Sequence, residues 1–130
     1  MSTLQKVCDK LLNNADLTLS VDGLSGVVKL EFYPAAFDGV ITLYCADYSR
    51  LNYRKSAGDE DAIFVGEVNI TIKEDIASVA KLYKEDGWQS YSQELLNPVA
   101  HIEVEGGAMF SIVCEKLSWQ ESNSGIQIVL

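Results

Sequence analysis

Apolar and polar residues alternate on both sides of a glycine pair in the C-terminal third of the chain. Residues 100–105 follow this pattern up to Gly106-Gly107, and residues 110–115 resume it beyond. A period of two predicts half-buried strands. An odd loop, most simply of three residues, brings the two apolar rows onto one face, whereas a two-residue turn sets Ile102 beside Ser111. Residues 98–119 therefore predict an antiparallel hairpin near the middle of a sheet, with one apolar and one acidic face.

Similar patterns predict the remaining strands. Five further strands are expected, at residues 17–22, 28–33, 40–46, 62–72 and 126–130. Turn residues from Asp22 to Gly26 separate the first two strands, and Pro34 ends the second. Residues 47–61 are interpreted as a solvated loop or hairpin end, because three basic residues are followed at once by three acidic ones. Residues 88–97 are left as either a loop or a short helical turn.

Two segments have the spacing of amphipathic helices. Residues 3–14 carry an apolar stripe that suits core packing or, alternatively, a homodimer contact. A second helix is expected to run to about Glu85, opened by a capping box from Thr71 to Glu74 and stopped by Gly87. The predicted order is α-β-β-β-β-α-β-β-β. Residues 1–130 are thus expected to form a single α+β domain, a mostly antiparallel sheet of about seven strands with two flanking helices.

The net charge of −9 adds a functional constraint. Ten basic residues stand against nineteen acidic ones, and residues 85–130 hold seven acids and one base, Lys116. Acidity of this kind is common in proteins that simply need to be soluble. Gathered on one face, it steers a basic protein partner to the surface and repels the phosphates of nucleic acid.

The cysteines and the apolar segments predict the compartment. Cys8, Cys45 and Cys114 are odd in number and have no C-x-x-C spacing, which favours three reduced thiols in a cytoplasmic protein. No apolar run approaches the ~20 residues that span a bilayer, and the N-terminus lacks the features of a secretory signal. No membrane association is expected.

Catalytic chemistry has little support in the sequence. His101 shares a strand face with Glu103 and Glu105, so a carboxylate-oriented base is geometrically possible. No serine or cysteine has the setting of a nucleophile, and no phosphate-binding, metal-binding or cofactor-binding motif is present. An enzyme or small-ligand binder that uses His101 and nearby carboxylates is therefore the alternative to a non-enzymatic protein, with no metal or cofactor expected. Trp119, at the end of the hairpin, is either a core residue or a binding anchor.

The N-terminal quarter carries a family resemblance. An amphipathic helix followed by LTLSVDGLSGVVKLEFYP resembles the opening of type III secretion chaperones, which implies a chaperone function. The chain departs from that pattern later, with a fourth strand before the second helix and a strand in place of the chaperones' final helix. By class alone, a small acidic α+β protein is also similar to the immunity proteins that neutralise nuclease toxins.

Together these observations favour a non-enzymatic, acidic protein-binding module that occludes a basic partner. Its most concrete form is a toxin-neutralising immunity protein. The residues expected to contact the partner are Glu103, Glu105, Glu115, His101, Trp119, Asp59, Glu60 and Asp61.

Overall fold

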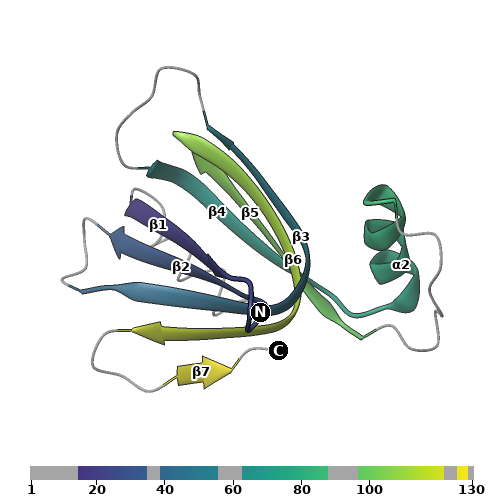
Figure 1. Cartoon of the computed structure of the whole chain (residues 1–130). Helices are drawn as coiled ribbons and strands as arrows, with labels where there is room; N and C mark the ends of the chain where they lie inside the picture. The colour runs from purple at the N-terminus through teal and green to yellow at the C-terminus, as the bar shows by residue number, and fades with distance from the viewer. Residues whose placement is uncertain (1–14, 35–38, 56–62, 88–96, 122–125, 129–130) are drawn as a thin grey trace.

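A computed structural model describes residues 15–34, 39–55, 63–87, 97–121 and 126–128 of the chain. Six antiparallel strands form the sheet, the three-residue strand β7 is attached to the end of β6, and one helix lies to one side (Figure 1). The elements in chain order are β1 (Ala15–Asp22), β2 (Val27–Pro34), β3 (Ile41–Lys55), β4 (Ile63–Lys73), α2 (Ile76–Glu85), β5 (Val99–Gly106), β6 (Ala108–Glu121) and β7 (Ile126–Ile128).

The six strands close on one another. Their order is β3-β2-β1-β4-β5-β6, and β6 pairs back onto β3 along its whole length. The junction between β1 and β4 is the shortest, with three residue pairs between Ala15–Leu17 and Ile63–Val65. Closure leaves the apolar sides of all six strands facing one shared interior. β7 pairs with Ser118–Gln120, beyond the part of β6 that pairs with β5.

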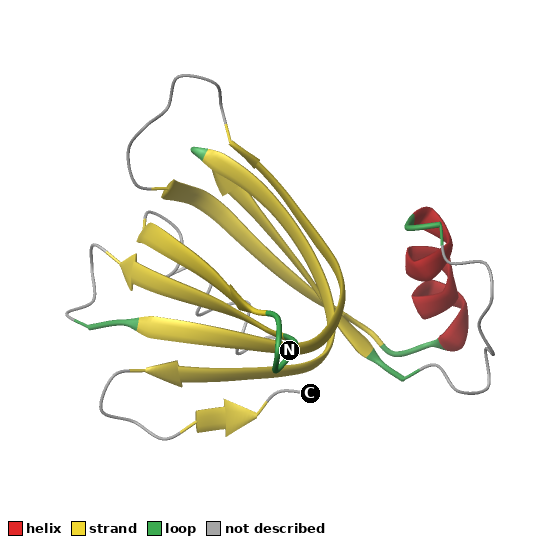
Figure 2. Cartoon of the chain, in the orientation of Figure 1, coloured by secondary structure: helices red, strands yellow, loops and turns green. Residues whose placement is uncertain are grey.

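The predicted α+β architecture of seven strands with two flanking helices is wrong. Within the described residues the chain is mostly antiparallel sheet of six strands, and α2 is the one helix (Figure 2). The expected helix at 3–14 lies outside the described residues, as does the ambiguous segment from 88 to 96. Among the described residues, no helix is both long enough and apolar enough to cross a membrane.

The largest difference from the sequence prediction is the length of β3. The loop expected from residue 47 is strand as far as Lys55. Its pairing with β6 shifts by one residue between Tyr48 and Arg50, next to Asp47, whose φ is 52°. Both long strands curve in this region, from the β1–β2 side of the sheet toward β4 and β5 (Figure 1). The shift places Arg50 opposite Val113 on the outer side of the sheet.

The predicted hairpin is confirmed, including its odd loop. Glu105 pairs with Met109, so three residues separate the paired positions. Ile102 then lies opposite Ile112, with Ile70 on its other side in β4. All three side chains are buried in the interior of the sheet. The acidic side of the hairpin consequently faces outward.

Helix α2 packs on the outside of the sheet, over a small apolar cluster of its own. Val79 and Leu82 of α2 are buried with Val99 of β5 and Val113 of β6. The predicted capping box is wrong, because the N-cap is Asp75, whose carboxylate accepts a hydrogen bond from the Ser78 backbone at 2.9 Å. The predicted stop at Gly87 is confirmed by its φ of 84°.

Two of the three cysteines can be placed. Cys45 and Cys114 are fully buried in the interior and form no disulfide. A hydrogen bond with the Cys114 thiol, reinforced by burial, raises the pKa of the Cys45 thiol. Because the thiolate is the reactive form, neither access nor ionisation favours modification of Cys45 in the folded chain.

We therefore expect Cys45 and Cys114 to react slowly with an aromatic disulfide reagent in the native protein and at once in denaturant. Thiol titration under non-reducing conditions should find three thiols in the denatured chain, Cys8 included. Mass spectrometry of the trapped protein assigns each modified residue. Rapid native labelling of Cys45 or Cys114, or a single thiol after denaturation, contradicts the prediction.

Candidate functional site

Three glutamates come together on the outer side of β4 and β5. Glu67 pairs directly with Glu105, and Glu103 lies two pairs further along on the same side, opposite Asn69. This pairing continues the register in which Val68–Lys73 pair with Val99–Val104, and a register shift at Gly66 lies just beyond it, so that Val65 is also buried. The Glu105 carbonyl oxygen approaches to 3.3 Å from the position that a Cβ on Gly66 would occupy.

We call the exposed side chains of Glu67, Asn69, Glu103, Glu105 and Met109 the acidic face. All five are exposed, and Met109, which is 54 % exposed, adds an apolar contact beside the carboxylates. No Lys or Arg among the described residues forms an ion pair with the three glutamates. Directly opposed like charges destabilise a sheet, so the face carries a repulsion that no described Lys or Arg compensates. The Asn69 amide donates a hydrogen bond to Glu67 Oε1 at 3.0 Å.

A shallow groove of about 210 Å³ runs beside the acidic face, across β5, β6 and β3. Glu103, Glu105 and Met109 line one part of it, and Asn52, Arg54 and Ser111 line another. Arg54 pairs with Met109, which places it two strands away from Glu105. Within the described residues Arg54 forms no ion pair with Glu103 or Glu105, so it lies beside the acidic face as a separate charge.

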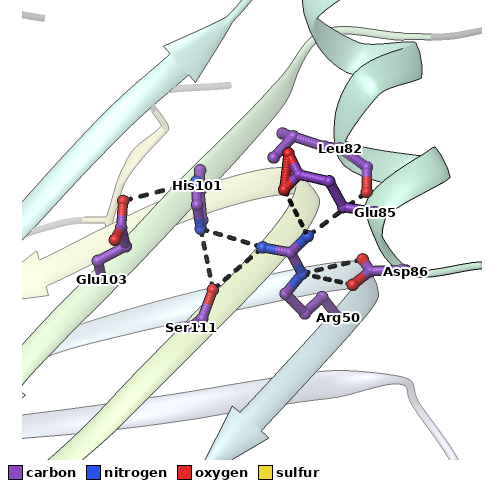
Figure 3. A network of polar contacts seen from close by, with 7 residues as sticks. All are labelled: Arg50, Leu82, Glu85, Asp86, His101, Glu103 and Ser111. Carbon is purple, nitrogen blue, oxygen red and sulfur yellow. Dashed lines mark hydrogen bonds and ion pairs between the residues drawn. The ribbon is translucent and has the colours of Figure 1, made fainter.

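Arg50 connects the sheet to the C-terminal end of α2 (Figure 3). Its Nε lies 2.8 and 2.9 Å from the two carboxylate oxygens of Asp86, and its Nη2 lies 3.4 Å from the Leu82 carbonyl and 3.8 Å from Glu85. The Arg50 side chain is 10 % exposed. A cation here also compensates the partial negative charge at the end of the helix.

The other side of the guanidinium meets His101. Arg50 Nη1 lies 3.4 Å from His101 Nε2 and 3.3 Å from Ser111 Oγ, and Oγ is 2.9 Å from Nε2. Because a guanidinium can only donate, Nε2 accepts, and the proton of the neutral ring is assigned to Nδ1. Nδ1 faces Glu103 Oε1 at 3.7 Å. The network therefore extends from α2 to the acidic face through Arg50 and His101 (Figure 3).

The surroundings of His101 are polar. A hollow of about 330 Å³ between α2 and the sheet is lined by Lys73, Ser78, Lys81, Glu85, His101 and Glu103, with one apolar residue, Leu82. Its charged residues are of both signs, which differs from the mostly apolar pockets that enclose small ligands. Within the described part of the chain, no three His, Cys, Asp or Glu side chains are grouped as metal ligands would be.

The structure separates the residues that the sequence grouped as partner contacts. Glu103 and Glu105 belong to the acidic face, and His101 borders it with its side chain 13 % exposed. Glu115 lies four residues beyond Ser111 along β6, where Asn97 contacts its carboxylate at 3.5 Å, so it does not join them. Trp119 is 5 % exposed and belongs to the core. Asp59, Glu60 and Asp61 lie outside the described residues.

Sequence reasoning missed Arg50, Asp86 and Glu67 as parts of this region. The run of charges predicts a loop or hairpin end at Arg50, although Leu51 and Tyr53 alternate with polar neighbours as they would in a strand. Glu67 follows Gly66, and a glycine inside a strand pattern is a signal for a bulge. Nothing in the local sequence pairs Arg50 with Asp86, which lies 36 residues away.

Comparison with protein families and with curated proteins gives no relationship from which a role could be transferred. No family model matches the chain, and no curated protein matches it. The functional conclusion therefore rests on the acidic face and on the network beside it.

Proposed function

We propose that this chain is a non-enzymatic binding protein that uses the acidic face to occlude a basic surface of a partner protein. One observation carries the proposal: Glu67 and Glu105 are directly opposed, with Glu103 beside them, and none is paired with a Lys or Arg of the described residues. Repulsion between these carboxylates does not stabilise the fold, so the arrangement brings no benefit unless the glutamates have another role. Lysines and arginines of a partner relieve it.

Charge on such a surface acts mainly on the rate of association. Exposed carboxylates attract a basic partner before contact. At physiological ionic strength, salt screens this attraction over a distance of ~8 Å. Exposed Met109 and the adjoining groove offer apolar area for the contact itself. Fast, salt-sensitive binding is the expected behaviour.

In its most specific form, the partner is a basic toxin such as a nuclease, and the chain neutralises it in the cytoplasm. This version rests on analogy between small acidic proteins. The alternative role, a chaperone like those of type III secretion, rests on the resemblance of the N-terminal quarter. Both versions require a protein partner.

A hydrolytic enzyme has less support. Ser111 Oγ, His101 Nε2 and Glu103 lie in the order of a nucleophile, a base and an orienting carboxylate. Arg50, however, contacts the same Nε2 at 3.4 Å. A cation there competes for the lone pair that would take the serine proton, and it weakens the base.

We expect Glu103→Lys/Glu105→Lys to slow association with a basic probe by roughly tenfold at low salt. Reversing two charges removes most of the electrostatic attraction that steers the probe to the acidic face. A lysine homopeptide of about a dozen residues serves as the probe, with rates measured by stopped-flow fluorescence over a range of salt. The variant should fold normally, since exposed charges add little stability.

The matched control is Asp16→Lys/Glu74→Lys, which changes the net charge equally at two exposed positions outside the acidic face. It should change the association rate only slightly. Equal slowing by the two variants would mean that the probe senses net charge alone, and the proposal would fail.

A further inference from the structure

His101 lies between the acidic face and the contacts that hold α2. On its own strand it faces Glu103, with 3.7 Å between Nδ1 and Oε1. From β3 it meets the Arg50 guanidinium at 3.4 Å, and from β6 the uncharged Ser111 hydroxyl at 2.9 Å. A change in charge on this ring therefore acts on both neighbours.

The remaining charged groups around the ring come from β4 and α2. Lys73 of β4, with Lys81 and Glu85 of α2, lines the hollow next to His101. Burial is the main cause that lowers the pKa of His101 below its usual 6.5, and Glu103 opposes it by favouring the charged ring. Arg50 and Lys73 lower this pKa further, while Glu85 raises it. The ring is therefore neutral at pH 7 and takes up a proton only below its ordinary range.

We propose that His101 makes binding by the acidic face pH-dependent, because the protonated ring pairs with Glu103 and withdraws that carboxylate from the partner. The proposal rests on the proposed function and adds a regulator to the same site. Protonation places the cation next to Glu103, whose side chain is 53 % exposed. The face then presents two uncompensated glutamates, Glu67 and Glu105, instead of three.

Thermodynamic linkage requires the reverse effect as well. If protonation of His101 weakens binding of a cation, binding of that cation must lower the pKa of His101 by the same coupling. His101 is the single histidine of the chain. No other side chain ordinarily titrates between about pH 5.5 and pH 7, so a response in this range reports on His101.

The experiment follows the ring resonances of His101 by NMR as the pH is lowered, in the full chain. In the unmodified protein the pKa should lie below 6.5, the value usual for histidine. Glu103→Gln should lower it further, since the neighbouring anion is lost. Glu115→Gln, a matched change on β6 outside the acidic face, should leave it unchanged.

The lysine homopeptide then tests the coupling. Its presence should lower the pKa of His101 in the unmodified protein and not in Glu103→Gln. Its affinity should fall roughly two- to fivefold as the pH is lowered through the pKa measured for His101, the fall expected for one exposed charge pair. His101→Gln, which cannot be protonated, should abolish that fall.

The possible failures are distinguishable. If Glu103→Gln and Glu115→Gln shift the pKa of His101 equally, or if the pH dependence survives His101→Gln, the regulatory inference is wrong while the proposed function stands. If the charge-reversal variant of the acidic face binds the peptide no differently from the Asp16/Glu74 control, both are wrong.

Discussion

Ile102→Ala is expected to lower the free energy of unfolding by about 2–5 kcal/mol, the cost of removing a large aliphatic side chain from a packed interior. Ile102 is fully buried and lies in a row with Ile70 and Ile112 across three strands. Because strands on both sides of it fix the backbone, the space left by the truncation cannot close easily. Denaturant unfolding followed by tryptophan fluorescence gives the free energy.

The matched control for Ile102→Ala is Ile76→Ala, the same chemical change at the first residue of α2, where the side chain is 47 % exposed. Its cost should be below about 1 kcal/mol, because little apolar area returns to water and alanine favours helix. A loss below ~0.5 kcal/mol for Ile102→Ala would show that this row is not the core of the sheet.

Arg50→Met is expected to cost about 2–4 kcal/mol and to loosen α2. The change keeps most of the aliphatic stem but leaves the Asp86 carboxylate, 18 % exposed, without its two hydrogen bonds. Removing one partner of a largely buried ion pair costs more than the pair contributes, because the remaining charge stays poorly solvated. The helix end also loses its neighbouring cation.

Two measurements separate this role from a general loss of stability. Hydrogen exchange should quicken more at the amides of α2 than at those of the β5–β6 hairpin, since Arg50 holds the helix to the sheet. A double-mutant cycle with Asp86→Asn should give a coupling energy of at least about 1 kcal/mol. Arg54→Met is the control, because Arg54 is exposed, points to the same side of β3 and has no ion pair among the described residues. If the two arginine variants are equally stable, Arg50 does not hold α2.

Charge reversal on the acidic face and protonation of His101 test the same surface in different ways. Charge reversal at Glu103 and Glu105 changes how quickly a basic partner arrives, while protonation of His101 changes how many carboxylates meet it. Both depend on which side chains of β5 face outward. These are fixed because Ile102 is buried on the inner side of the strand. The core and the candidate site are therefore two sides of the same hairpin.

The sequence alone determined the hairpin, its odd loop and the outward direction of Glu103 and Glu105. These features follow from strand geometry, because side chains alternate with a period of two and a one-residue slip would bury the glutamates. The turn at Asp22 was equally local, since its carboxylate accepts from the backbone of Leu24 at 3.0 Å. Such contacts span a few residues and leave a pattern in the chain.

Only the tertiary structure decided how the strands close and which distant residues meet. The pairing of β4 with β5 brings Glu67 beside Glu105, and the register shift after Tyr48 turns Arg50 toward Asp86 and His101. β3 continues through a charged segment because its two sides differ. Its outer side carries Arg50, Asn52 and Arg54. On its other side, Leu51 and Tyr53 pair with the inward Ile112 and Phe110. The same closure buries Trp119 in the core. The physical reason is that pairing between strands far apart in sequence is selected by the packing of the whole interior, which no local pattern encodes.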